Sequence, residues 1–221
     1  MISEISIKAR QTTMDPISKL TEYFREFPGI GPRQARRFVY FLLTRNINYL
    51  EDIARLILDI KKSIRICESC YRFYQDGKTS ICPICSDNNR NKNELMIVSR
   101  DVDFEIIEKS KCYTGYYFIL GGNIPILDKE PEKRVRLNEL IRKIKASIEN
   151  KDNNKNIKEI ILSLNANAEG EHTIEFLRSY IKNKFPDTEF KISVLGKGLS
   201  TGSELEYSDS DTIKNALKNR E

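Results

Sequence analysis

Four of the five cysteines lie in two closely spaced pairs, and this spacing constrains the fold more than any other feature of the chain. Cys67, Cys70, Cys82 and Cys85 form the pattern C-x2-C-x11-C-x2-C. Two such pairs offer four thiolates to one ion, which is typical of a structural Zn²⁺ site and leaves no open position for a catalytic water. We therefore expect one structural Zn²⁺ per chain, in a zinc finger too small to fold without its metal.

Two disulfides are the alternative explanation of the cysteine pairs. Disulfides need an oxidising compartment, and the N-terminus lacks the basic and then apolar pattern of a signal peptide. No run of about 18 apolar residues is present, so we expect no membrane span and a cytoplasmic protein. The single histidine argues against His-based metal cages and most His-driven catalysis. The fifth cysteine, Cys112, is expected to be an ordinary small buried residue.

The segment before the cysteines is predicted to be helical. Asp15 and Pro16 are typical of an N-cap and a first helical turn, and apolar residues then recur at helical spacing up to Phe27. The segment 28–32 must break this helix, and a second helix follows. A third is expected over residues 49–66, whereas residues 1–14 have no clear periodicity.

The break between the first two helices reads F-P-G-I-G-P, which favours a helix-hairpin-helix. Gly29 and Gly31 allow the backbone to approach a phosphate, and the amides that begin the second helix point toward such an anion. Arg33, Arg36 and Arg37 follow directly and add positive charge. The alternative is a simple helix–helix turn with solvated arginines. Phosphate contacts of this kind position a DNA backbone without reading its sequence.

From Glu94 onward, short apolar strands alternate with amphipathic helices, which predicts a mainly parallel sheet with helices on its faces. We expect a polar linker over residues 86–93. The expected strands cover residues 95–98, 116–120, 157–164 and 190–195, and the expected helices cover residues 102–109, 136–148 and 171–185. A last helix is expected from Thr212, capped by Asp211, after a glycine loop at residues 196–202 that lacks the order of a P-loop.

The segment that follows the third expected strand lies where ligands approach an open α/β sheet. With Asp at positions 165 and 167, it would be a Mg²⁺ site of the Toprim type, used for phosphoryl transfer on DNA. Asn165 and Asn167 stand there instead, and Ser99 stands where catalytic Toprim domains carry a Glu. Most of the charge that holds Mg²⁺ is therefore missing. Glu169 and Glu171 remain, and could bind a basic partner or, weakly, a metal.

The order of these motifs resembles the RecR family of bacterial recombination proteins over residues 15–221. The resemblance is carried by F-P-G-I-G-P-R-Q-A-R-R, the four cysteines, Y-T-G-Y-Y-F-I-L-G-G, A-E-G-E-H-T and T-G-S-E-L-E-Y-S-D. It implies a non-enzymatic mediator of DNA repair that forms a homo-oligomer, from a dimer to a tetrameric ring, and can encircle double-stranded or gapped DNA. It also implies that the protein acts together with RecO and RecF to load RecA at single-stranded gaps.

In the family, basic DNA-contacting residues occupy the positions of Arg33 and Arg37, and an acidic surface that meets RecO occupies those of Glu169 and Glu171. The chain departs from the family in the long x11 spacing and in Ser99. Two alternatives stay open: a Mg²⁺-dependent nuclease or topoisomerase of the Toprim type, and a zinc-stapled scaffold without direct DNA binding.

The expected fold class is therefore α/β with four parts along the chain. They are an extension and helix-hairpin-helix domain (1–66), a four-cysteine zinc finger with its linker (67–93), a Toprim domain (94–195) and a C-terminal segment (196–221). Residues 1–66 contain 12 basic and 7 acidic residues and therefore have a net charge of +5, which equals the net charge of the whole chain. The positive charge is thus concentrated on this N-terminal helical arm. This distribution favours nucleic-acid binding by that arm.

Overall fold

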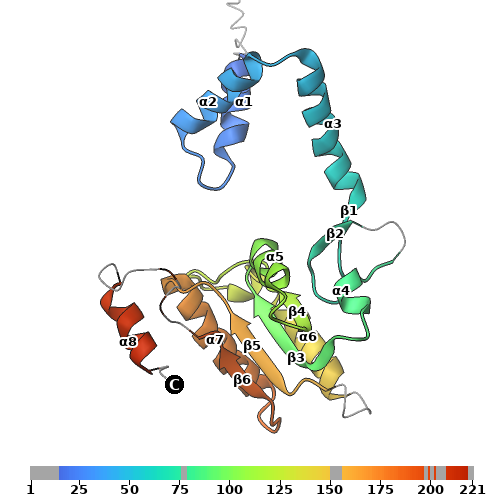
Figure 1. The fold of residues 1–221 in the computed structure, drawn as a ribbon, viewed down its shortest axis with the longest axis vertical. Coiled ribbons are helices and arrows are strands. Elements are labelled where there is room, and N and C mark those ends of the chain that lie inside the picture. Colours follow the sequence, from blue (N-terminus) through green and yellow to red (C-terminus); the bar gives the residue numbers. More distant parts are fainter. Residues whose placement is uncertain are drawn as a thin grey trace, which may run out of the picture. The chain divides into compact units, whose positions relative to one another are not determined.

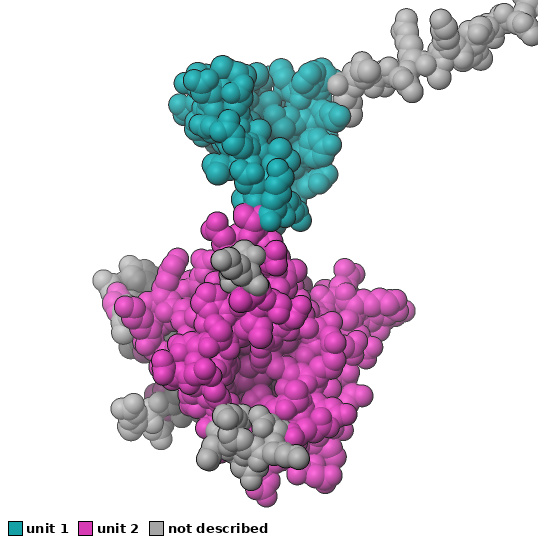
Figure 2. All heavy atoms as spheres, turned by 90° about the vertical axis from the view of Figure 1, so that its right-hand side faces the viewer, with its two compact units in different colours: residues 1–62 teal, residues 63–221 magenta. Residues whose placement is uncertain are grey.

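The computed structural model describes residues 15–75, 79–149, 156–196, 199, 202 and 208–218. The chain separates into two compact units between residues 62 and 63 (Figure 2). The first unit is helical, and the second contains the cysteine pairs and a four-stranded sheet (Figure 1). The expected division into four domains stays a prediction. None of the helices in the described part of the chain is long and apolar enough to cross a membrane.

The first unit consists of α1 (Pro16–Arg25), α2 (Pro32–Leu43) and nearly all of α3 (Ile47–Ser63). The predicted start of α1 is confirmed, because the Asp15 carboxylate accepts hydrogen bonds from the backbone N–H groups of Ile17 and Ser18. A tight turn with Gly29 at φ +76° separates α1 from α2, and α2 begins at Pro32. The rings of Phe24 and Phe38 pack edge to face at 5.8 Å and join the two helices.

The expected end of the third helix at Ile66 is wrong. Helix α3 ends at Ser63, and residues Ile64–Ile66 form strand β1, which pairs in antiparallel orientation with β2 (Phe73–Gln75). This two-stranded sheet leads into and out of the first cysteine pair. Of the second pair, Cys82 is the N-cap of the short helix α4 (Pro83–Ser86) and Cys85 lies within that helix. The expected helix would have placed residues Ile64–Ile66 in its last turn, but their backbone groups form the hydrogen bonds of this short β-ladder instead.

The main sheet contains β3 (Asn91–Val98), β4 (Gly115–Ile119), β5 (Glu159–Ser163) and β6 (Lys191–Val194). Its strand order is β4-β3-β5-β6, and all three pairings are parallel, as the sequence predicts. Strand β3 begins at Asn91, so the expected linker over residues 86–93 is too long: its last residues already pair with neighbouring chain segments. Successive side chains of β3 alternate between the two faces of the sheet.

One face of the sheet packs against α5 (Asp101–Ser110), and the other packs against α6 (Leu137–Ile148) and α7 (Ala168–Lys184). Met96 and Val98 of β3 join Phe104 of α5 in the smaller core. Leu95 and Ile97 face the larger core, which α6 and α7 fill with aliphatic side chains. A short 3-10 helix, η1 (Pro131–Lys133), precedes α6.

The last element is α8 (Ser210–Lys218). The expected cap Asp211 is wrong, since Asp209 accepts hydrogen bonds from the backbone N–H and hydroxyl of Thr212, and the helix begins two residues before Thr212. Residues 1–14 and most of the glycine loop at 196–202 lie outside the described residues.

Candidate metal centre and nucleic-acid interface

The four paired cysteines converge on one point. Their sulfur atoms all lie within 4.8 Å of one another, and the Cys70 and Cys82 sulfurs are 3.6 Å apart. Four sulfurs at about 2.3 Å from a tetrahedral Zn²⁺ would be about 3.8 Å from each other, so the cluster matches the size of a zinc site. All five cysteines of the chain are free of disulfides. Cys67, Cys70 and Cys82 are fully buried, whereas Cys85 is half-buried.

The four thiols lie close enough to shift one another's pKa. Hydrogen bonds from Cys70, Cys82 and Cys85 lower the pKa of Cys67. The contact with Cys67 in turn raises the pKa of Cys70 and of Cys85. Four thiolates at these distances would repel one another, and a divalent cation is what allows them to share so small a space.

The first cysteine knuckle is attached to the main sheet by hydrogen bonds. The backbone N–H of Ile119, at the end of β4, donates to the carbonyl oxygen of Cys70 at 2.8 Å. The Lys143 ammonium of α6 donates to the hydroxyl of Ser69 at 2.8 Å and to its carbonyl oxygen at 3.1 Å. The cysteine cluster therefore belongs to the same compact unit as the sheet.

Tyr71, the residue after the knuckle, adds an apolar contact. Its backbone adopts a positive φ of 64°, and its ring packs 5.4 Å from that of Phe118. The guanidinium of Arg136 lies 5.6 Å from the centre of the Tyr71 ring and donates to the carbonyl oxygen of Ile119. Aromatic packing and a cation–π contact thus hold the knuckle against the sheet.

At the carboxyl end of the sheet, the residues at the Toprim positions have structural partners. Ser99 is buried, and its hydroxyl donates to the side-chain oxygen of Asn123 at 2.6 Å. Asn167 caps α7 by accepting a hydrogen bond from the backbone N–H of Gly170 at 2.9 Å. Asn165 is exposed, and its carbonyl oxygen lies directly against Gly170, where a side chain would not fit.

Glu169 and Glu171 are exposed in the first turn of α7, where the sequence places them. His172 is half-buried on the same helix. Among the described residues, the cysteine cluster is the one group of three or more Cys, His, Asp or Glu side chains that could hold a metal ion. Cys112 is exposed, so the prediction that it is buried is wrong: it follows Lys111, which ends α5 in the left-handed conformation.

In the helical unit, α1 and α2 enclose a groove of about 420 Å³. Arg33, Arg36 and Arg37 all line it, so the structure brings the three predicted arginines together. Arg25 and Tyr40 also line the groove and were missed by sequence reasoning. Arg25 belongs to the other helix, and only the packing of α1 on α2 places it there. The remaining lining residues are Thr21, Glu22 and Pro32.

The backbone at the start of α2 is accessible, as phosphate binding requires. No atom lies within 4 Å of the position where a side chain would begin at Gly29 or Gly31. Gly31 is the N-cap and has no side chain to accept from the first free N–H groups of α2. Three exposed arginines therefore lie in the first two turns of α2, close to its open N-terminus, and this arrangement attracts anions.

Helix α3 shows an apolar surface that the sequence analysis did not single out. All 17 of its residues are described, and none is buried. Leu56, Ile57, Leu58 and Ile60 expose between 58% and 63% of their surface. Clusters of exposed apolar side chains are typical of protein–protein contact surfaces.

Comparison with known proteins gives matches along almost the whole chain. Residues 17–61 match the family described as RecR, helix-hairpin-helix, and residues 93–196 match the Toprim domain. Residues 198–221 match the family described as RecR, C-terminal.

Curated relatives cover nearly the full length. Recombination protein RecR of Bifidobacterium adolescentis is 33% identical over 205 residues, which are 92% of this chain and 94% of the relative. The protein of the same name from Chloroflexus aggregans is 31% identical over 93% of each chain. That of Staphylococcus aureus is 31% identical over 93% of this chain and 96% of the relative.

Proposed function

The chain belongs to the RecR family of recombination proteins, which implies a role in DNA repair and recombination, and from that premise we propose that it is a DNA-binding clamp subunit. The observation that carries the proposal is the groove between α1 and α2. There, Arg33, Arg36 and Arg37 meet Arg25 beside the open N-terminus of α2.

The groove would bind the DNA backbone by charge. Arginine side chains and backbone amides both suit phosphate oxygens, and neither distinguishes one base sequence from another. Binding would therefore be independent of sequence and would weaken steeply with salt, because each phosphate contact releases counterions. Gly29 and Gly31 would allow a phosphate to reach the backbone N–H groups of α2.

In the second unit, Cys67, Cys70, Cys82 and Cys85 would hold one Zn²⁺. Four thiolates complete its coordination, so the metal would supply stability and no reaction chemistry. The hydrogen bonds of Ile119 and Lys143 to the first knuckle mean that the metal would also support the edge of the sheet.

Self-association would multiply the DNA contacts. One helical unit offers a single basic groove, and a homo-oligomer, from a dimer to a tetrameric ring, would present several grooves at high effective concentration. The exposed apolar residues of α3 support such association, because a protein surface of this kind is ordinarily covered by a partner.

The Toprim domain would bind proteins and not catalyse phosphoryl transfer. The three positions that carry acidic residues in catalytic Toprim domains hold Ser99, Asn165 and Asn167. The Ser99 hydroxyl is already hydrogen-bonded to Asn123, and the Asn167 side chain already caps α7. The exposed Glu169 and Glu171 would meet a basic surface of RecO. Together with RecO and RecF, the oligomer would help to load RecA at single-stranded gaps in the cytoplasm, at the nucleoid.

The test is DNA binding by the double variant Arg33→Glu with Arg37→Glu, compared with Lys61→Glu plus Lys62→Glu as a control of equal charge change on α3. We expect the first variant to lose most of its affinity for duplex and gapped DNA at low salt, and the control to bind nearly as the wild type does. Normal binding by the first variant would favour the scaffold alternative. Mg²⁺-dependent nicking that is lost in Glu169→Ala would favour the nuclease alternative.

A further inference from the structure

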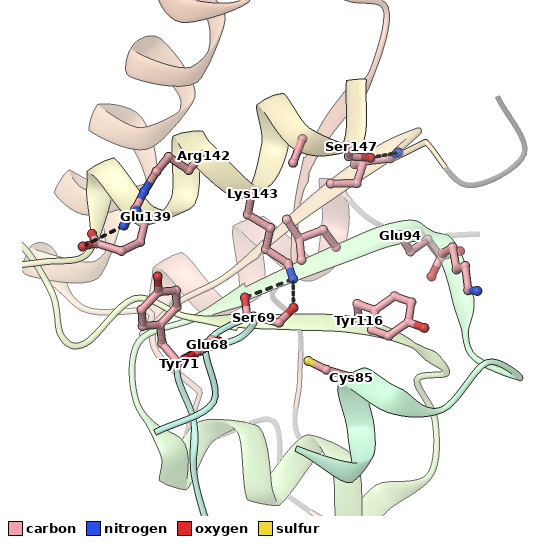
Figure 3. A pocket seen from close by; sticks show the side chains of 14 residues that line it. Glu68, Ser69, Tyr71, Cys85, Glu94, Tyr116, Glu139, Arg142, Lys143 and Ser147 are labelled. Atoms are coloured by element: carbon pink, nitrogen blue, oxygen red, sulfur yellow. Dashed lines mark hydrogen bonds and ion pairs between the residues drawn. The ribbon is translucent and has the colours of Figure 1, made fainter. Parts of the chain in front are cut away.

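The second unit contains a cavity of about 590 Å³ between the cysteine pairs, the sheet and α6 (Figure 3). Cys85 lines this cavity, whereas Cys67, Cys70 and Cys82 are completely buried. In Figure 3 the Cys85 side chain points toward the cavity from α4, with Lys143 of α6 above it. A small molecule in solvent can thus reach one sulfur of the cluster and not the other three.

We propose that Cys85 is the site at which peroxides attack the cysteine cluster, and that the cavity is their route to it. The proposal rests on the zinc site proposed above. It goes beyond that site because the four cysteines would bind the metal alike but would differ in how readily peroxides reach them. Accessibility controls the order in which thiolates are oxidised, and here accessibility differs sharply within one cluster.

The reaction has two steps. The Cys85 thiolate attacks one peroxide oxygen, the O–O bond breaks, and the products are Cys85 sulfenic acid and hydroxide. A second thiolate of the cluster, within 4.8 Å, then attacks the Cys85 sulfur, forms a disulfide and releases a second hydroxide. The two sulfurs supply the two electrons that reduce the peroxide, and the two hydroxides take up two protons to give water. Two thiolates remain, which are too few to retain Zn²⁺.

Loss of the metal would be transmitted to the sheet. The Cys70 carbonyl oxygen accepts from the N–H of Ile119, and the neighbouring Ser69 is bonded to Lys143. Opening of the cluster releases the knuckle that supplies both acceptors. Oxidation at Cys85 would therefore loosen the end of β4 and the contact between the knuckle and α6.

The experiment uses the full chain with Cys112→Ser, which removes the exposed thiol outside the cluster. Zinc content is measured first, and zinc release by hydrogen peroxide is then followed with a chelating dye. Alkylation of thiols at early times, followed by peptide mass spectrometry, identifies the sulfur that reacts first. Ala146→Phe fills the cavity from α6, and Asn138→Phe, which is exposed on the same helix but outside the cavity, is the matched control.

We expect modification to start at Cys85, and Ala146→Phe to slow zinc release several-fold while Asn138→Phe leaves the rate unchanged. Equal early modification of all four cysteines would overturn the proposal, and so would equal rates in the two phenylalanine variants. A purified protein without stoichiometric zinc would instead contradict the proposed metal site, so the two failures are distinguishable.

Discussion

The backbone N–H of Ile119 donates a 2.8 Å hydrogen bond to the carbonyl oxygen of Cys70, so that an edge strand of the sheet ends on the first cysteine knuckle. Ile119 is itself buried, and Arg136 donates to its carbonyl oxygen. The sheet and the cysteine cluster therefore share one boundary, and we expect the stability of one to depend on the other.

Removal of zinc should destabilise this boundary first. A chelator in excess is expected to accelerate hydrogen exchange of the Ile119 amide far more than that of Leu162, which lies in the interior strand β5. The measurement is hydrogen exchange resolved at these amides, with and without chelator. Equal protection of Ile119 in both conditions would show that the knuckle does not need a metal.

The ion pair between Arg90 and Glu108 should contribute to stability in a pH-dependent way. Two hydrogen bonds of 2.7 and 2.9 Å join the side chains, which are 10% and 30% exposed. Glu108→Gln is expected to lower the free energy of unfolding by about 1–3 kcal/mol. Glu175→Gln, in an exposed pair with Arg178, is the control and is expected to cost less than about 1 kcal/mol.

The pH dependence follows from the hydrogen bond with Arg90, which lowers the pKa of Glu108 from its ordinary value near 4.5. The folded state therefore holds the charged form more strongly than the unfolded state does. The contribution is complete above about pH 4.5 and disappears as the pH falls through the lower pKa of the folded protein. Urea titrations of the wild type and Glu108→Gln should thus converge in acid, and a constant difference would contradict the assignment.

Gly170 should not tolerate a side chain. A methyl group there would overlap the backbone carbonyl of Asn165, which lies in the short connection between β5 and α7 and would have to shift. Gly170→Ala is expected to cost about 3 kcal/mol or more. Gly196→Ala has open space around it and is expected to stay within about 0.5 kcal/mol of the wild type. Thermal unfolding of both variants checks this, and equal melting temperatures would refute the close approach.

The apolar surface of α3 should mediate self-association. Leu56→Glu with Ile60→Glu places two charges one helical turn apart on this surface and is expected to lower the solution mass of the protein. Lys61→Glu with Lys62→Glu adds negative charge to the same helix without removing apolar area, and should leave the mass unchanged. Light scattering at several protein concentrations distinguishes these outcomes. An unchanged mass in the first variant would exclude α3 from the interface.

Much of the fold follows from local signals in the sequence. Asp15 and Pro16 mark the start of α1, and strand–helix alternation predicts the parallel sheet, which the strand pairing confirms. Features that depend on contacts beyond neighbouring residues could not be predicted in this way. The end of α3 depends on the ladder between β1 and β2, and the cap of α8 depends on which of several nearby acidic residues meets Thr212.

The candidate sites divide in the same way. The spacing of the cysteines predicts their cluster, because each pair lies in one tight turn. Arg33, Arg36 and Arg37 are neighbours in sequence and share a groove, but Arg25 joins them only through packing of α1 on α2. The partial exposure of Cys85 likewise depends on α6, which is more than 50 residues away in the sequence and leaves the cavity open.

The most direct test of the account is the salt dependence of DNA binding. For each phosphate contact, the logarithm of the association constant should fall with the logarithm of salt concentration with a slope of about −0.9. We predict that Arg33→Glu with Arg37→Glu binds more weakly and with a slope shallower by about 2 per protomer, while Lys61→Glu with Lys62→Glu keeps nearly the slope of the wild type. An identical slope and affinity in the wild type and the arginine variant would contradict the claim that the groove between α1 and α2 holds DNA.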